Sequence, residues 1–202
     1  MLTIALPKGR IAQETLEKFE KAFDDKFIFE DRKLILEKGN FRFLNVRNQD
    51  VPTYVMHGAA DLGVVGLDVL EEKEYDLIKL LNLNLGKCKV AFGLRKGEEL
   101  DFSKSEIKVA TKHEKIAKKY FEQKAMAVEI IKLYGSIELA PIVGLSDCIV
   151  DIVETGTTMK QNGLEVGPTI MESSAHLIAN KNAFYAKKQA ILELKQRLEK
   201  VL

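Results

Sequence analysis

The chain has 202 residues, of which 46% are hydrophobic and 30% charged, a composition typical of an ordinary soluble globular protein. Its formal net charge is +1, so no global field favours nucleic acid or an anionic membrane as a partner. The two cysteines and three histidines lack metal-ligand spacing, which argues against a zinc site. Because neither a signal peptide nor a membrane-spanning apolar stretch is present, we expect a cytoplasmic protein.

Strand and helix patterns alternate along the first part of the chain. Apolar or alternating runs predict strands at 2–6, 33–36, 41–46 and 62–65. Apolar residues at helical spacing predict an amphipathic helix at 11–23, and a second helix is expected to start at 50–52, where a proline stands early. Strand-to-helix alternation of this kind predicts an α/β sheet covered by helices on both faces.

A second set of such units begins near Lys89. Strands are predicted at 89–94, 107–110, 128–133, 166–170 and 175–178, and helices at 113–121, 137–145 and the C-terminus. We interpret the pattern as two α/β lobes, with the second inserted into the first. Lobe I would comprise 1–88 and 181–202, and lobe II would comprise 89–180. The cleft between two lobes is the default place for a ligand.

The most informative segment is residues 147–163, DCIVDIVETGTTMKQNG. A buried strand delivers Asp151 and Glu154 onto Thr155-Gly156-Thr157-Thr158, which is predicted to be a tight loop opening onto a helix. Unpaired N–H groups at a helix start and threonine hydroxyls suit a phosphate monoester, whereas the two acids suit polyols or a metal ion. A sugar phosphate matches both. The bland alternative is that the threonines only cap the helix.

Basic residues mark other turns. Lys8 and Arg10 flank Gly9 at the start of the first helix, where the helix dipole disfavours cations, so an anion between them is an even alternative to a solvated basic turn. Arg32 and Arg47 stand at predicted strand ends, and guanidinium groups bind phosphates bidentately.

Two further turns carry polar residues. The segment GAADLGVVGLD, which ends at Asp68, is glycine-spaced but lacks the dinucleotide fingerprint, so it indicates either a flat ligand near the backbone or simple tight packing. Ser136 and Glu138 follow the strand at 128–133, where Ser136 is either an N-cap or a ligand contact. His113 stands at a charged helix start and is interpreted as a surface residue.

Five segments together resemble the ATP phosphoribosyltransferase family, and they occur in the family's order between Met1 and about Asn180. They are LPKGR at 6–10, RNQDVPTYVMHGAADLGVVGLD at 47–68, VATK at 109–112, LYGSIELAPIVGLSD at 133–147 and IVDIVETGTTMKQNGL at 149–164. The resemblance implies a two-lobed fold like that of type II periplasmic binding proteins. It also implies transfer of the 5-phosphoribosyl group of phosphoribosyl pyrophosphate to N1 of ATP, with Mg²⁺, as the first step of histidine biosynthesis.

The resemblance also implies roles for residues. Thr155 to Thr158 would hold the 5-phosphate, and Asp151 with Glu154 would face the ribose hydroxyls or the metal. The positions implied on the ATP and pyrophosphate side are Lys8, Gly9, Arg10, Arg32, Arg47, Asp68, Ser136 and Glu138, with Lys8, Arg32 and Arg47 acting in catalysis. Mg²⁺ would be held mainly by substrate phosphates.

The chain ends with one helix where long family members carry a regulatory domain, so it resembles the short form. The short form implies a homodimer that assembles with a regulatory subunit resembling histidyl-tRNA synthetase. Two alternatives stay open. One is a non-catalytic two-lobed module that binds or senses a small molecule, and the other is a phosphoribosyltransferase for another base.

Overall fold

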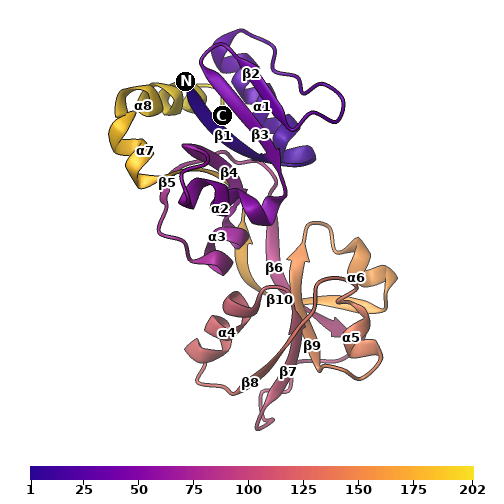
Figure 1. Ribbon diagram of the computed structural model, residues 1–202. Helices are drawn as coiled ribbons and strands as arrows, with labels where there is room; N and C mark the ends of the chain where they lie inside the picture. Colours follow the sequence, from indigo (N-terminus) through magenta and orange to yellow (C-terminus); the bar gives the residue numbers. More distant parts are fainter. The chain divides into compact units, whose positions relative to one another are not determined.

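The computed structural model describes residues 1–202, which fold into two compact units. The first unit contains Met1–Lys87 and Ser174–Leu202, and the second is the intervening segment Cys88–Ser173 (Figure 1). The insertion of one α/β lobe into another is thus confirmed. The position of the second junction differs from the prediction at 180, because the strand Ala175–Ala179 hydrogen-bonds into the sheet of the first unit.

The first unit is built on a six-stranded sheet with the order β2-β3-β1-β4-β11-β5. Strands β1, β3 and β4 run parallel to one another, whereas β2 and β11 are antiparallel to their neighbours. The strands are β1 (Leu2–Pro7), β2 (Ile35–Lys38), β3 (Phe41–Val46), β4 (Leu62–Gly66), β5 (Ile78–Asn82) and β11 (Ala175–Ala179).

Helices cover both faces of this sheet, as expected. One face carries α1 (Arg10–Phe23) and α8 (Lys188–Glu199), whose apolar stripes bury Phe19 and Leu194 against the strands. The other carries α2 (Val51–Met56) and α3 (Leu67–Lys73), and the remaining helices are η1 (Asn48–Asp50) and α7 (Lys181–Ala186). A Cβ on Gly63 would lie 2.7 Å from Val55 Cγ2, so this glycine serves close packing of α2 on β4.

The second unit has a five-stranded sheet with the order β10-β6-β9-β7-β8. Strands β7, β8 and β9 are parallel, and β6 and β10 close one side in antiparallel fashion. The strands are β6 (Cys88–Arg95), β7 (Ile107–Thr111), β8 (Val128–Lys132), β9 (Cys148–Val153) and β10 (Leu164–Ser173). Helix α4 (Glu114–Gln123) packs on one face, and α5 (Leu139–Ile142) and α6 (Thr157–Gln161) pack on the other.

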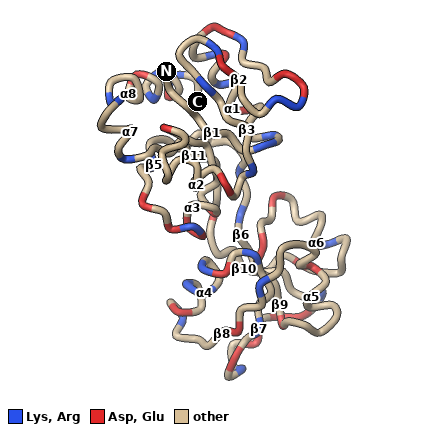
Figure 2. Tube along the Cα trace, in the orientation of Figure 1, with Lys and Arg blue, Asp and Glu red and all other residues tan.

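Charge is interspersed along both units, where Lys and Arg alternate with Asp and Glu on the tube (Figure 2). Most ion pairs that these residues form are exposed, and such pairs contribute little stability. None of the helices combines the length and the apolar content that crossing a membrane requires.

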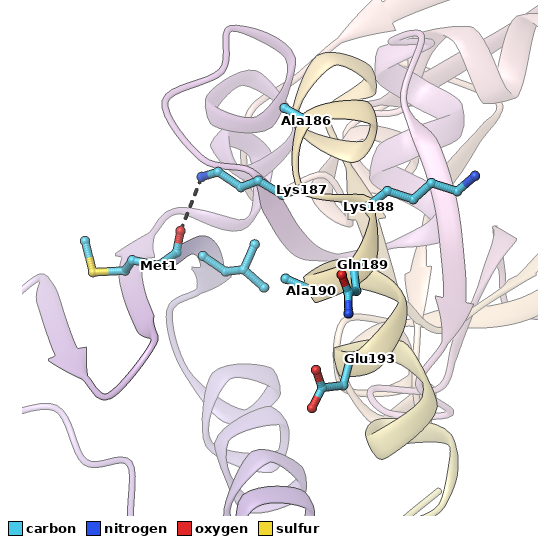
Figure 3. A pocket seen from close by; sticks show the side chains of 8 residues that line it. Met1, Ala186, Lys187, Lys188, Gln189, Ala190 and Glu193 are labelled. Carbon is cyan, nitrogen blue, oxygen red and sulfur yellow. Dashed lines mark hydrogen bonds between the residues drawn. The ribbon is translucent and has the colours of Figure 1, made fainter.

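The predicted C-terminal helix, with its apolar stripe at 191–201, corresponds to α8, and a further helix, α7, precedes it across Lys187. Lys187 Nζ lies 2.8 Å from both carboxylate oxygens of Asp61 and 3.3 Å from the carbonyl oxygen of Met1. Figure 3 shows the cavity of about 400 Å³ at this junction, lined by the N-terminus and by residues 186–190 and 193. It contains none of the predicted site residues, so we do not assign it to the functional site.

Candidate functional site

The three parallel strands of the second unit end at one edge of their sheet, and the predicted site residues of this unit follow those ends. Thr111 ends β7, Lys132 ends β8 and Val153 ends β9, in parallel register. Ligands of open α/β sheets bind outside the carboxyl ends of parallel strands. The fold therefore gathers Ser136, Glu138 and the segment 151–158 at the edge where a ligand is expected.

The loop after β9 has the strand-loop-helix form predicted from the sequence. Gly156 adopts φ 79° and ψ 1°, a left-handed conformation that glycine adopts without steric cost. The hydroxyls of Thr155 and Thr157 lie 2.9 Å apart on the exposed side of the loop. A Cβ on Gly156 would lie 2.9 Å from Val166 Cγ2, so the loop packs closely on β10.

The capping interpretation holds for one threonine. The N-cap residue of α6 is Gly156, which has no side chain, but the hydroxyl of Thr155 accepts a hydrogen bond of 3.4 Å from the N–H of Thr157 in the first turn. Thr155, Thr157 and Thr158 are exposed. Because the N–H groups in the first turn of a helix have no partner within it, the loop offers both backbone and hydroxyl donors. Helix α6 has only five residues, so any attraction for an anion would come from these donors rather than from a long helix dipole.

Asp151 is largely enclosed, with a side chain that is 15% exposed. Its Oδ1 accepts a hydrogen bond from the N–H of Ile152 at 2.8 Å and lies 3.0 Å from Lys112 Nζ. Lys112 follows β7, the strand beside β9, so sheet order brings the two residues together. Glu154 lies beyond the strand and is exposed.

The interpretation of His113 as a surface residue is wrong. Its side chain is 1% exposed, and Nε2 lies 3.8 Å from Asp151 Oδ1. The N–H of His113 donates to Thr111 Oγ1 at 2.8 Å, and that hydroxyl donates to the carbonyl oxygen of Val150 at 2.6 Å. Neighbouring charges in the sequence suggested exposure, but the turn at the end of β7 directs this imidazole inward.

Ser136 does not cap a helix. Helix α5 starts at Leu139, its N-cap residue is Glu138, and no side chain forms a capping hydrogen bond. Ser136 is exposed and has φ 50°, which is uncommon for a residue other than glycine. Such conformations cluster at functional sites, so this placement favours the ligand-contact alternative.

A cavity of about 870 Å³ in the second unit adjoins the loop. Thr155, Gly156 and Thr157 line one part of it, and the other lining residues come from α6, the start of β10 and the end of β6. Two cations, Lys96 and Lys160, also line it. Its volume is within the range of small-molecule sites, about 300–1,000 Å³. Sequence reasoning did not identify either lysine: Lys96 stands in an ordinary charged stretch, and Lys160 was included in the segment 147–163 without a role.

The first unit presents a second group of predicted residues at the carboxyl edge of its own parallel strands. Lys8, Gly9 and Arg10 follow β1, and Arg47 follows β3 directly. Gly9 has φ 101° and precedes α1 without a side-chain cap. All four residues are exposed, so their cations and backbone are accessible to an anion.

Arg32 reaches the same edge by a different route. It lies in a turn with φ 57°, and the N–H of Asn45, near the end of β3, donates to the carbonyl oxygen of Leu34 at 2.8 Å. Because β2 is antiparallel to β3, the turn before β2 lies where β3 ends. The structure therefore brings Arg32 and Arg47 to one edge, although β2 starts two residues later than predicted.

Asp68 differs from the other predicted residues because it is only 3% exposed. It lies in the first turn of α3, where a carboxylate interacts favourably with the helix dipole. Together with the packing of Gly63, this placement favours tight packing over a flat ligand for the glycine-spaced segment.

The chain was compared with known proteins. The family profile described as HisG, ATP phosphoribosyltransferase, matches residues 47–200. The chain is 66% identical to a protein named ATP phosphoribosyltransferase from Wolinella succinogenes, over all of this chain and 98% of that protein. It is also 66% identical to the protein of the same name from Campylobacter fetus, over the full length of both. These relatives have the length of the short form.

Solved structures agree with the sequence comparisons. The chain resembles a structure titled ATP phosphoribosyl transferase (HisG:HisZ) complex from Thermotoga maritima, with a TM-score of 0.86, 36% identity and coverage of 100% of this chain and 98% of that one. The periplasmic aliphatic sulphonate binding protein SsuA from Escherichia coli, at 12% identity and TM-score 0.63 over 99% of this chain and 72% of that one, shares the fold alone. The predicted type II fold is confirmed, and the chain belongs to the ATP phosphoribosyltransferase family.

Proposed function

We propose that the chain transfers the 5-phosphoribosyl group of phosphoribosyl pyrophosphate to N1 of ATP, with the loop after β9 as its 5-phosphate site. The reaction is the first step of histidine biosynthesis and releases pyrophosphate. The observation that carries the site assignment is the convergence of Asp151 and the exposed threonines of the loop 154–158 at the carboxyl edge of β9. The family profile over residues 47–200 and the 66% identity over the full chain to a protein named ATP phosphoribosyltransferase support a phosphoribosyl donor at that edge.

Within this site the donor is held from two directions. The hydroxyls of Thr155, Thr157 and Thr158 and the loop backbone bind the 5-phosphate, and Gly156 permits the turn. Asp151 and Glu154 accept hydrogen bonds from the ribose hydroxyls. On this proposal the second unit is the donor side. Ser136 and Glu138, for which the resemblance implies contacts to ATP or pyrophosphate, follow β8 in this same unit.

The first unit is proposed as the ATP side. Lys8 and Arg10, with Gly9 between them, contact phosphates, and Arg32 and Arg47 stabilise the charge that grows on the departing pyrophosphate. Displacement at C1 of the ribose develops positive charge on the ring, which the nearby carboxylates tolerate. Adenine N1 is unprotonated at neutral pH, so the reaction requires no strong general base. The burial of Asp68 makes a direct contact to ATP the least supported of these assignments.

The side chains present could provide only some of the ligands that Mg²⁺ needs. The side chains contain no group of three or more His, Cys, Asp or Glu that could hold a metal ion. Mg²⁺ usually binds one or two carboxylates together with substrate phosphates. Asp151 and Glu154 are the carboxylates in the right place, and the ion would neutralise charge on the pyrophosphate when the substrates are bound.

For assembly, we propose a cytoplasmic homodimer that works with a regulatory subunit resembling histidyl-tRNA synthetase. The support is the solved Thermotoga maritima protein, which is titled as a HisG:HisZ complex. Histidine should then inhibit only the assembled enzyme. Strong inhibition of the purified chain alone by histidine would contradict this assembly.

A pyrophosphate-release assay tests the function. The chain, alone and with a candidate regulatory subunit, is incubated with phosphoribosyl pyrophosphate, Mg²⁺ and either ATP or free bases. We expect release that depends on ATP. Release with a free base instead would identify another phosphoribosyltransferase, and binding of the donor without release under any condition would favour a sensor module.

A further inference from the structure

Asp151 has a charge partner that its own segment does not provide. Lys112, from the turn after β7, places Nζ 3.0 Å from Asp151 Oδ1. His113 places Nε2 3.8 Å from the same oxygen. Both come from the turn after β7, 39 and 38 residues before Asp151 in the sequence, and both lie in the same unit as Asp151.

The turn that carries this lysine is fixed to β9 by buried hydrogen bonds. Thr111 is fully buried. Its hydroxyl donates to the carbonyl oxygen of Val150 at 2.6 Å and accepts from the N–H of His113 at 2.8 Å. The backbone on either side of Lys112 therefore has little freedom. The same turn places both Lys112 and the buried imidazole of His113 close to one oxygen of the Asp151 carboxylate.

The local charges explain why a lysine lies beside the Asp151 carboxylate. A carboxylate with only 15% of its side chain exposed is costly to leave unpaired, and it would also repel a donor that carries several phosphate charges. A lysine at 3.0 Å cancels that charge while leaving the second carboxylate oxygen to accept a hydrogen bond. The ribose hydroxyls are the donors expected there.

We propose that Lys112 is a positioning residue that neutralises and orients Asp151, so that this carboxylate binds the ribose of the phosphoribosyl donor. The inference rests on the proposed function. It differs from a contact to the phosphates, because Lys112 acts through Asp151 and not on the substrate itself.

The neighbouring strands provide a matched comparison. Lys108 on β7 and Glu129 on β8 also form an ion pair at 3.0 Å, but their side chains are 53% and 45% exposed. An exposed pair contributes little. Lys108→Met is therefore the control for removing a lysine from a lysine–carboxylate pair in the same sheet.

The experiment uses the full chain, assembled with its regulatory subunit where turnover requires it. The KM values for phosphoribosyl pyrophosphate and ATP, and kcat, are measured for Lys112→Met, Lys112→Arg, Asp151→Asn, the Lys112→Met/Asp151→Asn double variant and Lys108→Met. Calorimetric titration with phosphoribosyl pyrophosphate and Mg²⁺ gives the donor Kd without depending on turnover.

We expect Lys112→Met to weaken donor binding about tenfold, the effect of one partly exposed charge-assisted hydrogen bond. kcat and the KM for ATP should change less than about twofold, because a role confined to donor binding leaves both in place. Lys112→Arg should restore most of the donor affinity. The double variant should bind the donor no more weakly than Asp151→Asn alone, since the lysine has no function once the charge is gone.

Unchanged donor binding in Lys112→Met would overturn the inference, and so would effects of the two single substitutions that multiply in the double variant. Equal losses in donor and ATP parameters would show a merely structural role and would overturn it as well. If the parent turns over and the Lys112 variants match it, only this inference fails. A parent that neither binds the donor nor releases pyrophosphate would overturn the proposed function together with it.

Discussion

Replacing Gly156 by alanine tests the phosphate loop most directly. Gly156 has φ 79°, and an L residue with a Cβ loses about 1–2 kcal/mol in the left-handed region. The added Cβ would lie 2.9 Å from Val166 Cγ2, but Val166 is a partly exposed side chain that can move by a few tenths of an ångström. The total cost is therefore about 1–2 kcal/mol, a fraction of the usual 5–15 kcal/mol of stability, and the chain stays folded.

The same change shifts the backbone between Thr155 and Thr157, and it thereby displaces the hydroxyls of these two threonines. Because displacements of about 1 Å can cost a hundredfold, a smaller shift should raise the KM for phosphoribosyl pyrophosphate about tenfold. Gly144→Ala is the matched control, since Gly144 has φ 76°, lies in the same unit and has no atom within 4 Å of the added Cβ.

Both variants should lose similar stability on urea unfolding, and only Gly156→Ala should lose donor affinity. A Gly156→Ala enzyme that binds the donor like the parent would refute the placement of the 5-phosphate in this loop. Equal losses of donor affinity in both variants would show that the effect follows from stability alone.

Three further predictions follow from other parts of the chain. Arg32→Ala should keep the fold and lower kcat about 10²- to 10³-fold, the usual effect of removing one electrostatic contact to the transition state. The control Arg42→Ala removes only an exposed ion pair with Glu37 and should leave kcat unchanged. Normal rate constants for the Arg32 variant would refute its role. Lys187→Met should lower the free energy of unfolding by about 1 kcal/mol, discounted for the partial exposure of the lysine, because it leaves the Asp61 carboxylate without its ion pair and with only the hydrogen bond from the N–H of Thr3. An unchanged urea midpoint would contradict this. Burial raises the pKa of the Cys148 thiol from 9.0 to about 12, so iodoacetamide at pH 8 should label this residue only in denaturant. The stability that the protonated thiol provides should be present below pH 9 and decline between pH 9 and 12. Labelling of the folded chain at pH 8, detected by mass spectrometry, would show that the thiol is accessible.

The sequence predicts much of the fold because most strands are buried on both faces and appear as short apolar runs. β4, for example, starts at the predicted residue, Leu62, and ends one residue later than predicted. β5 (Ile78–Asn82) was not predicted, because it lies at the edge of its sheet, is half-exposed and contains Lys79. β11 was predicted as a strand but assigned to the wrong lobe, since an apolar run does not indicate which sheet it joins.

The candidate site, like the fold, could be predicted only in part from the sequence. The segment 151–158 is contiguous, so its acids and threonines could be identified together from the sequence. Ser136 and Arg32 owe their placement to left-handed turns that no local composition demands, and the inward position of His113 depends on one hydroxyl, that of Thr111. Such features arise from tertiary packing and are therefore absent from sequence patterns.

Sheet order explains why the acid of this site could be predicted and its lysine partner could not. β7 and β9 are separated by α4, β8 and α5 in the sequence, yet they are neighbours in the order β10-β6-β9-β7-β8. The crossover that places β8 outside β7 leaves the end of β7 free to lie against the end of β9. Lys112 therefore meets Asp151 because of a topological choice, and a prediction made one strand at a time has no access to that choice. A residue that adjusts the charge of a catalytic carboxylate should accordingly be sought on the adjacent strand of the sheet before it is sought in the adjacent sequence.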